Sequence, residues 1–361
     1  MRRFPSDVAT HDPGRFAVLL NINARGVSER VRQTIRRIVP EEHLFISANA
    51  EEADRHAATI IERRYDGVFS GGGDGSLVML INMLWKHVLR LNSRMSEAGS
   101  QRPEPFRFPM LGILKLGTGN GWAGVVGSKK GVRQLKHALA GGALKFIPFD
   151  LIETEGRRFH FSGMGWDAAI LNDYLEFKKL GSRFPRLKKF ITTLPGYLTS
   201  TFLKTIPVEA WKQLRGTGGM KIKVVNRGKR LFRIEGGGRP VPARFGRGDI
   251  IYHGPANVIG CATTPNYGFN MKAFPYAMTM PGLMNLRIVQ AGIPELVLNM
   301  GPIWEGTFRS PRFIDFLVSD VEIVASKPAP FHIGGDAEGL REQVRFGIAS
   351  EPVKVLDFSL D

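Results

Sequence analysis

The stretch Tyr65-Asp-Gly-Val-Phe-Ser-Gly-Gly-Gly-Asp-Gly-Ser76 decides the fold. Residues 65–70 have the composition of a short buried strand, and residues 76–90 place apolar side chains on one helical stripe, with Ser76 as a candidate N-cap. Four glycines between the two elements leave backbone amides uncovered next to a helix N-terminus. That arrangement binds phosphate, although a tight turn that needs positive φ angles explains the glycines equally well.

The neighbouring segments predict a parallel sheet around this turn. Strands are expected at 16–22, 43–47 and 109–116, and helices at 27–38 and 50–64, so strands and helices alternate. A second glycine-rich turn, Leu116-Gly-Thr-Gly-Asn-Gly121, follows the last of these strands. The carboxyl ends of parallel strands meet at one edge of a sheet, where ligands bind, so two such turns favour a nucleotide site.

The pattern of predicted secondary structure changes after residue 148. Strand-like runs punctuated by Gly and Pro then dominate and predict an antiparallel β domain. These runs are 144–152, 157–162, 220–226, 230–235, 249–253, 256–263, 284–290, 314–326 and 343–357. We therefore predict an α/β nucleotide domain over 1–148 and a β-rich domain over 149–361, whose C-terminal end packs back on the first domain. Residues 94–107 have the composition of a surface loop.

A third glycine-bounded segment, Gly334-Gly-Asp-Ala-Glu-Gly339, carries two carboxylates. Phosphoryl transfer to an alcohol benefits from a carboxylate that accepts the hydroxyl proton, and Asp336 and Glu338 are the candidates. The same residues also suit an ordinary acidic β-turn.

Composition limits the class of protein. The chain has 361 residues, a formal net charge of +17 and one cysteine, Cys261, so no disulfide can form within it and a Cys-rich metal site is excluded. No signal peptide and no long apolar run are found, which predicts a cytoplasmic protein without a transmembrane span. The positive charge favours anionic partners such as nucleotides, nucleic acid or anionic lipid.

The three motifs, in this order, resemble the diacylglycerol kinase catalytic-domain superfamily, which includes sphingosine, ceramide and bacterial lipid kinases. The segment Ser162-Gly-Met-Gly-Trp-Asp167 is similar to that family as well. The resemblance implies an α/β domain like those of NAD kinases and phosphofructokinases, followed by a β-sandwich-like domain. It also implies ATP and Mg²⁺ as cofactors and a lipid as the acceptor.

The resemblance assigns roles to individual residues. Asp336 matches the proposed general base, with Glu338 beside it, and Asp167 matches a contact to the lipid headgroup or, alternatively, caps the next helix. Ser76 replaces a threonine of the family, and Ala337 replaces a glycine. The residues expected to bind the nucleotide are Asn21, Gly72, Gly73, Asp74, Gly75, Ser76, Thr118, Gly119 and Asn120.

One departure from the family concerns a structural metal. Relatives often carry an Asp-Asp-Gly-Leu-Leu-Asp run, where this chain has Met280-Pro-Gly-Leu-Met-Asn285. The carboxylates that would hold a magnesium ion there are missing. We therefore assign no residue as a metal ligand.

Residues 176–204 alternate basic and apolar side chains. Such a segment can lie at an anionic membrane surface, or it can be a solvated basic face over a core stripe. We expect a lipid substrate, peripheral membrane association, no nucleic-acid partner and a possible homodimer. The predicted function is an ATP-dependent kinase of a diacylglycerol-like or sphingoid lipid. The alternatives are a kinase of a non-lipid alcohol and a catalytically weak lipid-binding or regulatory module.

Overall fold

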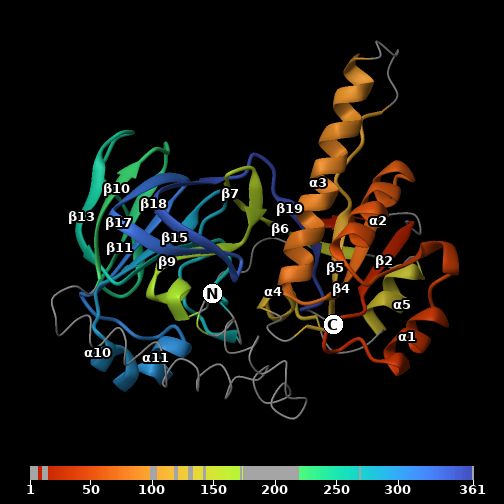
Figure 1. Ribbon diagram of the computed structural model, residues 1–361, viewed down its shortest axis with the longest axis horizontal. Coiled ribbons are helices and arrows are strands. Elements are labelled where there is room, and N and C mark those ends of the chain that lie inside the picture. The colour runs from red at the N-terminus through yellow and green to blue at the C-terminus, as the bar shows by residue number, and fades with distance from the viewer. Residues whose placement is uncertain are drawn as a thin grey trace. The chain divides into compact units, whose positions relative to one another are not determined.

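The computed structural model describes residues 7–9, 15–97, 104–117, 121–128, 133–140, 144–170, 173, 219–267 and 270–359. The chain forms two compact units (Figure 1). Unit 1 comprises residues 1–149 and 351–361, and unit 2 comprises residues 150–350. The last residues of the chain thus belong to the same unit as its beginning.

Unit 1 is built on a seven-stranded sheet with the order β1-β6-β19-β5-β4-β2-β3. Its strands are β1 (Asp7–Ala9), β2 (Phe16–Asn21), β3 (Leu44–Ser47), β4 (Gly67–Gly72), β5 (Met110–Lys115), β6 (Leu144–Phe149) and β19 (Val353–Leu356). The strands from β3 to β19 are parallel, whereas β6 runs antiparallel to β19, and β1 runs antiparallel to β6. The register sets Asn21 beside Ser47 and Gly72 beside Lys115, so the carboxyl ends of four strands lie along one edge.

Two helices of unit 1 begin at residues whose side chains cap them. Ser28 accepts a hydrogen bond from the Val31 N–H at the start of one helix, and Asn49 accepts one from the Glu52 N–H at the start of the next. The helices, including the short 3₁₀ turn η1, are α1 (Glu29–Arg36), η1 (Glu41–His43), α2 (Ala50–Glu62), α3 (Asp74–Glu97), α4 (Gly121–Val125) and α5 (Arg133–Leu139).

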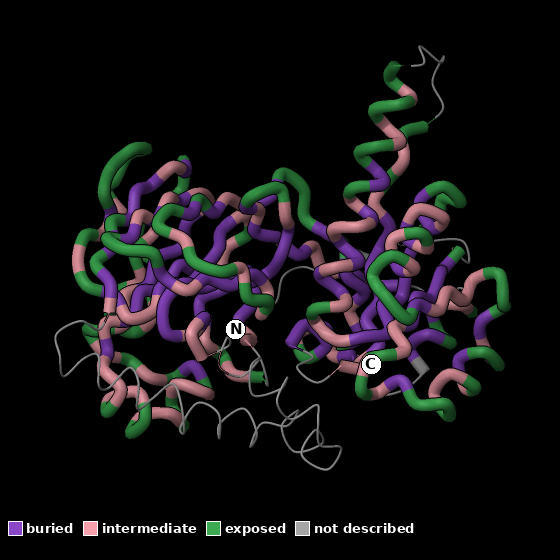
Figure 2. The backbone as a smooth tube through the Cα atoms, in the orientation of Figure 1, coloured by how far each residue is buried: buried purple, intermediate pink, exposed green. Residues whose placement is uncertain are grey.

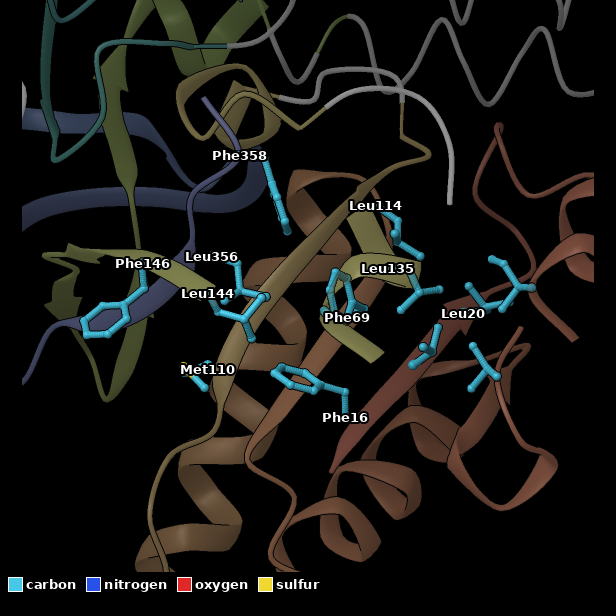
Figure 3. Packing of buried hydrophobic residues seen from close by; sticks show 14 residues of the cluster. Phe16, Leu20, Phe69, Met110, Leu114, Leu135, Leu144, Phe146, Leu356 and Phe358 are labelled. Carbon is cyan, nitrogen blue, oxygen red and sulfur yellow. The ribbon is translucent and has the colours of Figure 1, made fainter. Parts of the chain in front are cut away.

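One core of unit 1 gathers residues from both ends of the chain (Figure 3). Phe16 and Phe69 of neighbouring strands are in ring contact, at 5.9 Å between centroids. Leu356 and Phe358, from the C-terminal segment, belong to the same buried cluster. The burial of these two side chains explains why residues 351–361 fold with unit 1.

Unit 2 is built on a twelve-stranded antiparallel sheet. Ten strands follow the order β12-β11-β16-β15-β14-β9-β17-β18-β7-β8, while β10 pairs with both β13 and β17. The strands are β7 (Ile152–Thr154), β8 (Arg157–Phe159), β9 (Phe161–Gly165), β10 (Met220–Asn226), β11 (Leu231–Glu235), β12 (Arg239–Pro242), β13 (Ile250–Ala256), β14 (Val258–Ala262), β15 (Met284–Val289), β16 (Phe313–Val318), β17 (Asp320–Ile333) and β18 (Asp336–Ile348).

The long strand β17 joins two parts of this sheet. Its first half pairs with β10 and its last three residues pair with β9, and the register against β18 shifts between Val324 and Ala329. The predicted fold class is confirmed: an α/β unit with a mainly parallel sheet and a unit dominated by antiparallel β structure.

Several boundaries differ from the sequence predictions. The expected run 343–357 is two strands, β18 and β19, which belong to different units, because the chain turns at residues 349–352. Helix α3 continues to Glu97, into the segment that we expected to be a loop. Two short helices, α10 (Ile293–Leu298) and α11 (Met300–Trp304), were not predicted.

Residues 176–204, the basic and apolar segment, lie outside the described residues. Among the helices that the structure describes, none combines the length and the hydropathy needed to span a bilayer.

Candidate functional site

The glycine turn of unit 1 passes directly from strand to helix. Strand β4 runs through Gly72, and α3 already begins at Asp74, two residues earlier than predicted. A Cβ atom on Gly71 would lie 2.2 Å from Leu20 Cδ2, and one on Gly72 would lie 2.5 Å from Ser76 Cβ. A Cβ on Gly75 would meet nothing within 4 Å. Packing therefore requires the first two glycines, whereas Gly75 faces open space at a helix N-terminus.

Two polar side chains are held beside this turn. Asn21, the last residue of β2, donates a hydrogen bond from Nδ2 to Ser76 Oγ at 3.0 Å. Asn21 Oδ1 accepts from the backbone N–H of Asn23, which fixes the orientation of the amide. Asn21 and Ser76 line a small pocket together with Ser47 and Ser70. The structure thus brings together two residues that the sequence assigned to the nucleotide, although they are 55 positions apart.

Asp74 points away from this pocket and caps another helix. Its two carboxylate oxygens accept hydrogen bonds from the backbone N–H groups of Gly121, at 2.8 Å, and Trp122, at 3.2 Å, in the first turn of α4. Burial raises the pKa of the Asp74 carboxyl, and these two hydrogen bonds offset part of that rise. The contacts of Asp74 are therefore structural: they tie the first glycine turn to the end of the second.

Thr118, Gly119 and Asn120 of the second glycine turn lie outside the described residues. The residues before them are fixed at the same edge of the sheet. The Gly26 N–H donates to Leu116 O at 2.8 Å, and a Cβ on Gly26 would lie only 2.7 Å from that oxygen. Residue 26 must therefore be a glycine, because the loop after β2 and the end of β5 approach backbone to backbone.

The acidic turn of unit 2 is a hairpin between β17 and β18. Gly334 and Gly335 adopt φ angles of +59° and +93°, which a residue with a side chain rarely adopts. Asp336 is exposed at the start of β18, opposite Ile333. Ala337 pairs with His332 in the strand, so the alanine that replaces a glycine of the family sits in extended backbone.

The two carboxylates of this turn differ in their surroundings. Glu338 forms an ion pair with Arg157 of β8, and its backbone carbonyl accepts a hydrogen bond from Arg341. Since side chains alternate along a strand, Asp336 and Glu338 leave β18 on the face opposite to Ala337. Asp336 is the more exposed of the two, which makes it the better candidate for a proton acceptor.

Asp167 lies in a buried polar cluster that sequence reasoning missed. Its Oδ1 accepts from the Ala168 N–H at 2.8 Å, and its Oδ2 lies 3.1 Å from His332 Nε2. The hydroxyl of Tyr267 is 2.8 Å from the same nitrogen. A Cβ on Gly163 would lie 1.8 Å from Asp167 Oδ2, so this glycine makes room for the carboxylate.

The ring of His332 is fully buried, and its Nδ1 has no hydrogen-bond partner among the described residues. Its Nε2 faces both the Asp167 carboxylate and the Tyr267 hydroxyl, and these two contacts fix the orientation of the ring. The carboxylate next to His332 is 165 positions away in the sequence, so no local pattern predicts this contact.

Comparison with known proteins identifies the α/β unit. Residues 15–150 match the family model described as diacylglycerol kinase catalytic domain. The match covers most of unit 1 but not its C-terminal segment. This finding confirms the resemblance seen in the motifs and supports a nucleotide-binding transferase of the kinase type. A search of curated proteins finds no match to the sequence.

Solved structures show the same fold as this chain. A diacylglycerol kinase from Bacillus anthracis Sterne has a TM-score of 0.58 at 14% sequence identity, over 95% of this chain and 97% of the other. At this identity the likeness establishes the fold alone. An NAD kinase from Archaeoglobus fulgidus in complex with ATP covers 95% of this chain and 93% of its own at 11% identity, but its TM-score of 0.42 is too low to carry an argument.

Where relatives of the diacylglycerol kinase superfamily carry an acidic run, this chain has Asn285 next to an ion pair between Arg287 and Asp315. Asn285 donates from Nδ2 to Asp315 Oδ1 at 2.9 Å, and Arg287 binds both oxygens of Asp315. The Gly282 N–H donates to the Asp150 carboxylate, whose pKa burial raises. Among the described residues no three His, Cys, Asp or Glu side chains form a metal-binding group. The Asp315 carboxylate is already neutralised by an arginine.

Proposed function

We propose that the protein is an ATP-dependent kinase that phosphorylates the hydroxyl of a diacylglycerol-like or sphingoid lipid. The observation that carries this proposal is the turn Gly71–Ser76 at the N-terminus of α3, with open space in front of Gly75, inside a diacylglycerol kinase catalytic domain. Backbone N–H groups at a helix N-terminus favour the negative charge of a phosphate.

The residues of unit 1 fit the phosphates of ATP. In the proposed complex the N–H groups at the start of α3 bind phosphate oxygens, and the Asn21–Ser76 pair supplies side-chain hydrogen bonds. A magnesium ion bound with the nucleotide would neutralise charge on its phosphates. The only carboxylate of the turn, Asp74, already accepts two backbone hydrogen bonds, so we expect the ion to be held mainly by phosphates and water.

Asp336 is the proposed general base. Its exposed carboxylate accepts the proton of the acceptor hydroxyl while that oxygen bonds to phosphorus and the bond to the departing diphosphate breaks. Glu338 would support the turn through its ion pair with Arg157. Asp167, held by His332, would orient the polar headgroup of the lipid.

The test is a transfer assay with labelled ATP and Mg²⁺. Diacylglycerol, monoacylglycerol, ceramide and sphingosine are presented separately in mixed micelles, and glycerol serves as a water-soluble acceptor. We expect label in at least one extracted lipid and none in glycerol. Label in a soluble alcohol alone would show a kinase of a non-lipid alcohol. Vesicle binding without ATP consumption on any lipid would show a lipid-binding module, and either result would overturn the proposal.

A further inference from the structure

One edge of the unit 2 sheet is exposed over a continuous surface. The edge strand β12 pairs with β11 alone, and all four of its residues are exposed (Figure 2). The loop after β12 runs back beside residues 226–231: the Ala243 N–H donates to Leu231 O, and the Gly248 N–H donates to Asn226 O. Residues 226–235 and 239–250 therefore form one surface, which we call the basic edge.

The basic edge concentrates positive charge. Residues 226–250 contain seven lysines and arginines but only two acids, Glu235 and Asp249. Arg227 pairs with Glu322, and Arg230 donates to the carbonyl of Pro281. The carboxylate of Asp249 accepts the Gly246 N–H. The remaining five basic residues make no ion pair with any described residue: Lys229, Arg233, Arg239, Arg244 and Arg247.

Apolar side chains stand among these charges. Val241, Phe245 and Ile250 are 38%, 41% and 49% exposed. They are three of the seven large apolar side chains that are exposed in the described part of the chain, and they fall within ten residues. Val241 lies directly opposite Arg233 on the outer face of the hairpin, because Phe232 and Ile234 pack inward against a buried cluster.

Hydrogen bonds of a buried asparagine hold the backbone of the basic edge in place. Asn226, only 1% exposed, donates from Nδ2 to Gly246 O at 3.0 Å, and its own backbone N–H donates to Asp249 O. Gly248 takes a φ of +98°, which closes the loop. The loop that presents Arg244, Phe245 and Arg247 is therefore preformed, so little conformational freedom is lost when a partner binds.

We propose that the basic edge docks on the surface of an anionic lipid bilayer, with its five unpaired cations at the headgroups and Val241, Phe245 and Ile250 at the boundary of the acyl chains. Cations on such a surface are attracted to anionic headgroups, and apolar groups on the same surface are stabilised by burial at the membrane interface. A nucleic acid would use the charges but would leave Val241 and Ile250 in water. The proposal goes beyond the kinase reaction, because docking is measured without turnover.

The experiment is co-sedimentation of the full chain with vesicles. One set contains phosphatidylcholine alone, and the other contains equal parts of phosphatidylcholine and phosphatidylglycerol. The test variants are the triple Arg239→Gln/Arg244→Gln/Arg247→Gln and the single Phe245→Ser. The control is Arg30→Gln/Arg36→Gln/Arg37→Gln, on α1 and its C-cap, which removes the same charge from another exposed surface.

We expect the unaltered protein to bind the anionic vesicles only, and less tightly as salt is raised. Each lost charge should weaken binding about fivefold, so the triple variant should lose about 100-fold. Phe245→Ser should lose several-fold, and the α1 control should bind as the unaltered protein does. Equal binding by the basic-edge triple and the control overturns the proposal. The proposal is also overturned if the protein binds duplex DNA as tightly as it binds anionic vesicles and Phe245→Ser does not weaken that DNA binding.

Kinase turnover on lipid in neutral detergent micelles separates this proposal from the proposed function. The basic-edge variants should keep that turnover if the chain is a kinase. Absence of turnover in every variant, with vesicle docking intact, would reject the kinase proposal and leave the docking surface standing.

Discussion

The glycine turns at Gly71–Ser76 and Gly334–Gly339 look alike in sequence and differ in structure. The first joins a parallel strand to α3, and its aspartate is half-buried and caps another helix. The second joins two antiparallel strands, and its aspartate is exposed at a hairpin. The same Gly-Gly-Asp triplet therefore offers backbone amides in one unit and a carboxylate in the other.

The difference shows that the surrounding elements decide what a glycine-aspartate turn can do. At a helix N-terminus the free N–H groups attract an anion. The carboxylate of this turn caps a different helix. In the β-hairpin the turn backbone has positive φ angles that favour glycine. The group that this turn offers for a reaction is the side chain of its aspartate. A phosphoryl-transfer enzyme needs both an anion site and a proton acceptor.

Gly75→Ala tests the anion site of the first turn. The added methyl group enters open space, so it should not harm the fold and, within a helix, should stabilise it by up to about 1 kcal/mol. If phosphate binds there, kcat/KM for ATP should fall at least about tenfold, a barrier change of roughly 1.4 kcal/mol. Steady-state kinetics together with thermal unfolding measure both effects.

Gly301→Ala is the matched control, because Gly301 also lies in a helix and faces open space. It should leave kcat/KM unchanged. Full activity of Gly75→Ala would mean that phosphate does not occupy the space in front of α3.

The free energy of unfolding should separate the two aspartates. Asp74→Ala leaves the N–H groups of Gly121 and Trp122 without their acceptor, and should lower the free energy of unfolding of unit 1 by about 1–3 kcal/mol. Asp336→Ala changes an exposed side chain and should lower the free energy of unfolding less. Urea unfolding of the two variants compares them directly, and equal losses would contradict the structural role given to Asp74.

The smallest effect is expected for Tyr267→Phe, which removes one hydroxyl from the Asp167 cluster. Loss of a single hydrogen bond is worth about 1 kcal/mol, so KM for the lipid should rise about fivefold while KM for ATP stays constant. Tyr252→Phe removes a hydroxyl bonded to the Pro255 carbonyl and serves as the control. A rise in both KM values would show a general structural effect and not the positioning of Asp167.

Much of the fold could be predicted because short buried strands have a recognisable run of apolar, β-forming residues. The run 220–226 is β10 to the residue, and the alternation of strands and helices before residue 148 gave the parallel sheet. The division of 343–357 could not be predicted. Its apolar residues suit a strand throughout, and only the partners show that Phe346 and Val355 belong to different sheets.

The candidate site was predictable where the chemistry is local. Glycines before a helix indicate an anion site whatever the rest of the chain does. The partners of Asp74 are 47 and 48 residues away, and that of Asp167 is 165 residues away, so no local pattern reveals them. Gly163 in the segment Ser162–Asp167 was the one local indication of the Asp167 cluster, since a side chain there would clash with the carboxylate.

The central claim is that Asp336 accepts the proton of a lipid hydroxyl while the Gly71–Ser76 turn binds ATP. Its most direct test is lipid turnover and ATP binding of Asp336→Asn, which keeps the shape of the side chain but removes its basicity. We predict a fall in kcat of at least about 100-fold, with the dissociation constant for ATP unchanged. Turnover within about tenfold of the unaltered protein would contradict the assignment, because general-base catalysis contributes roughly 100-fold or more.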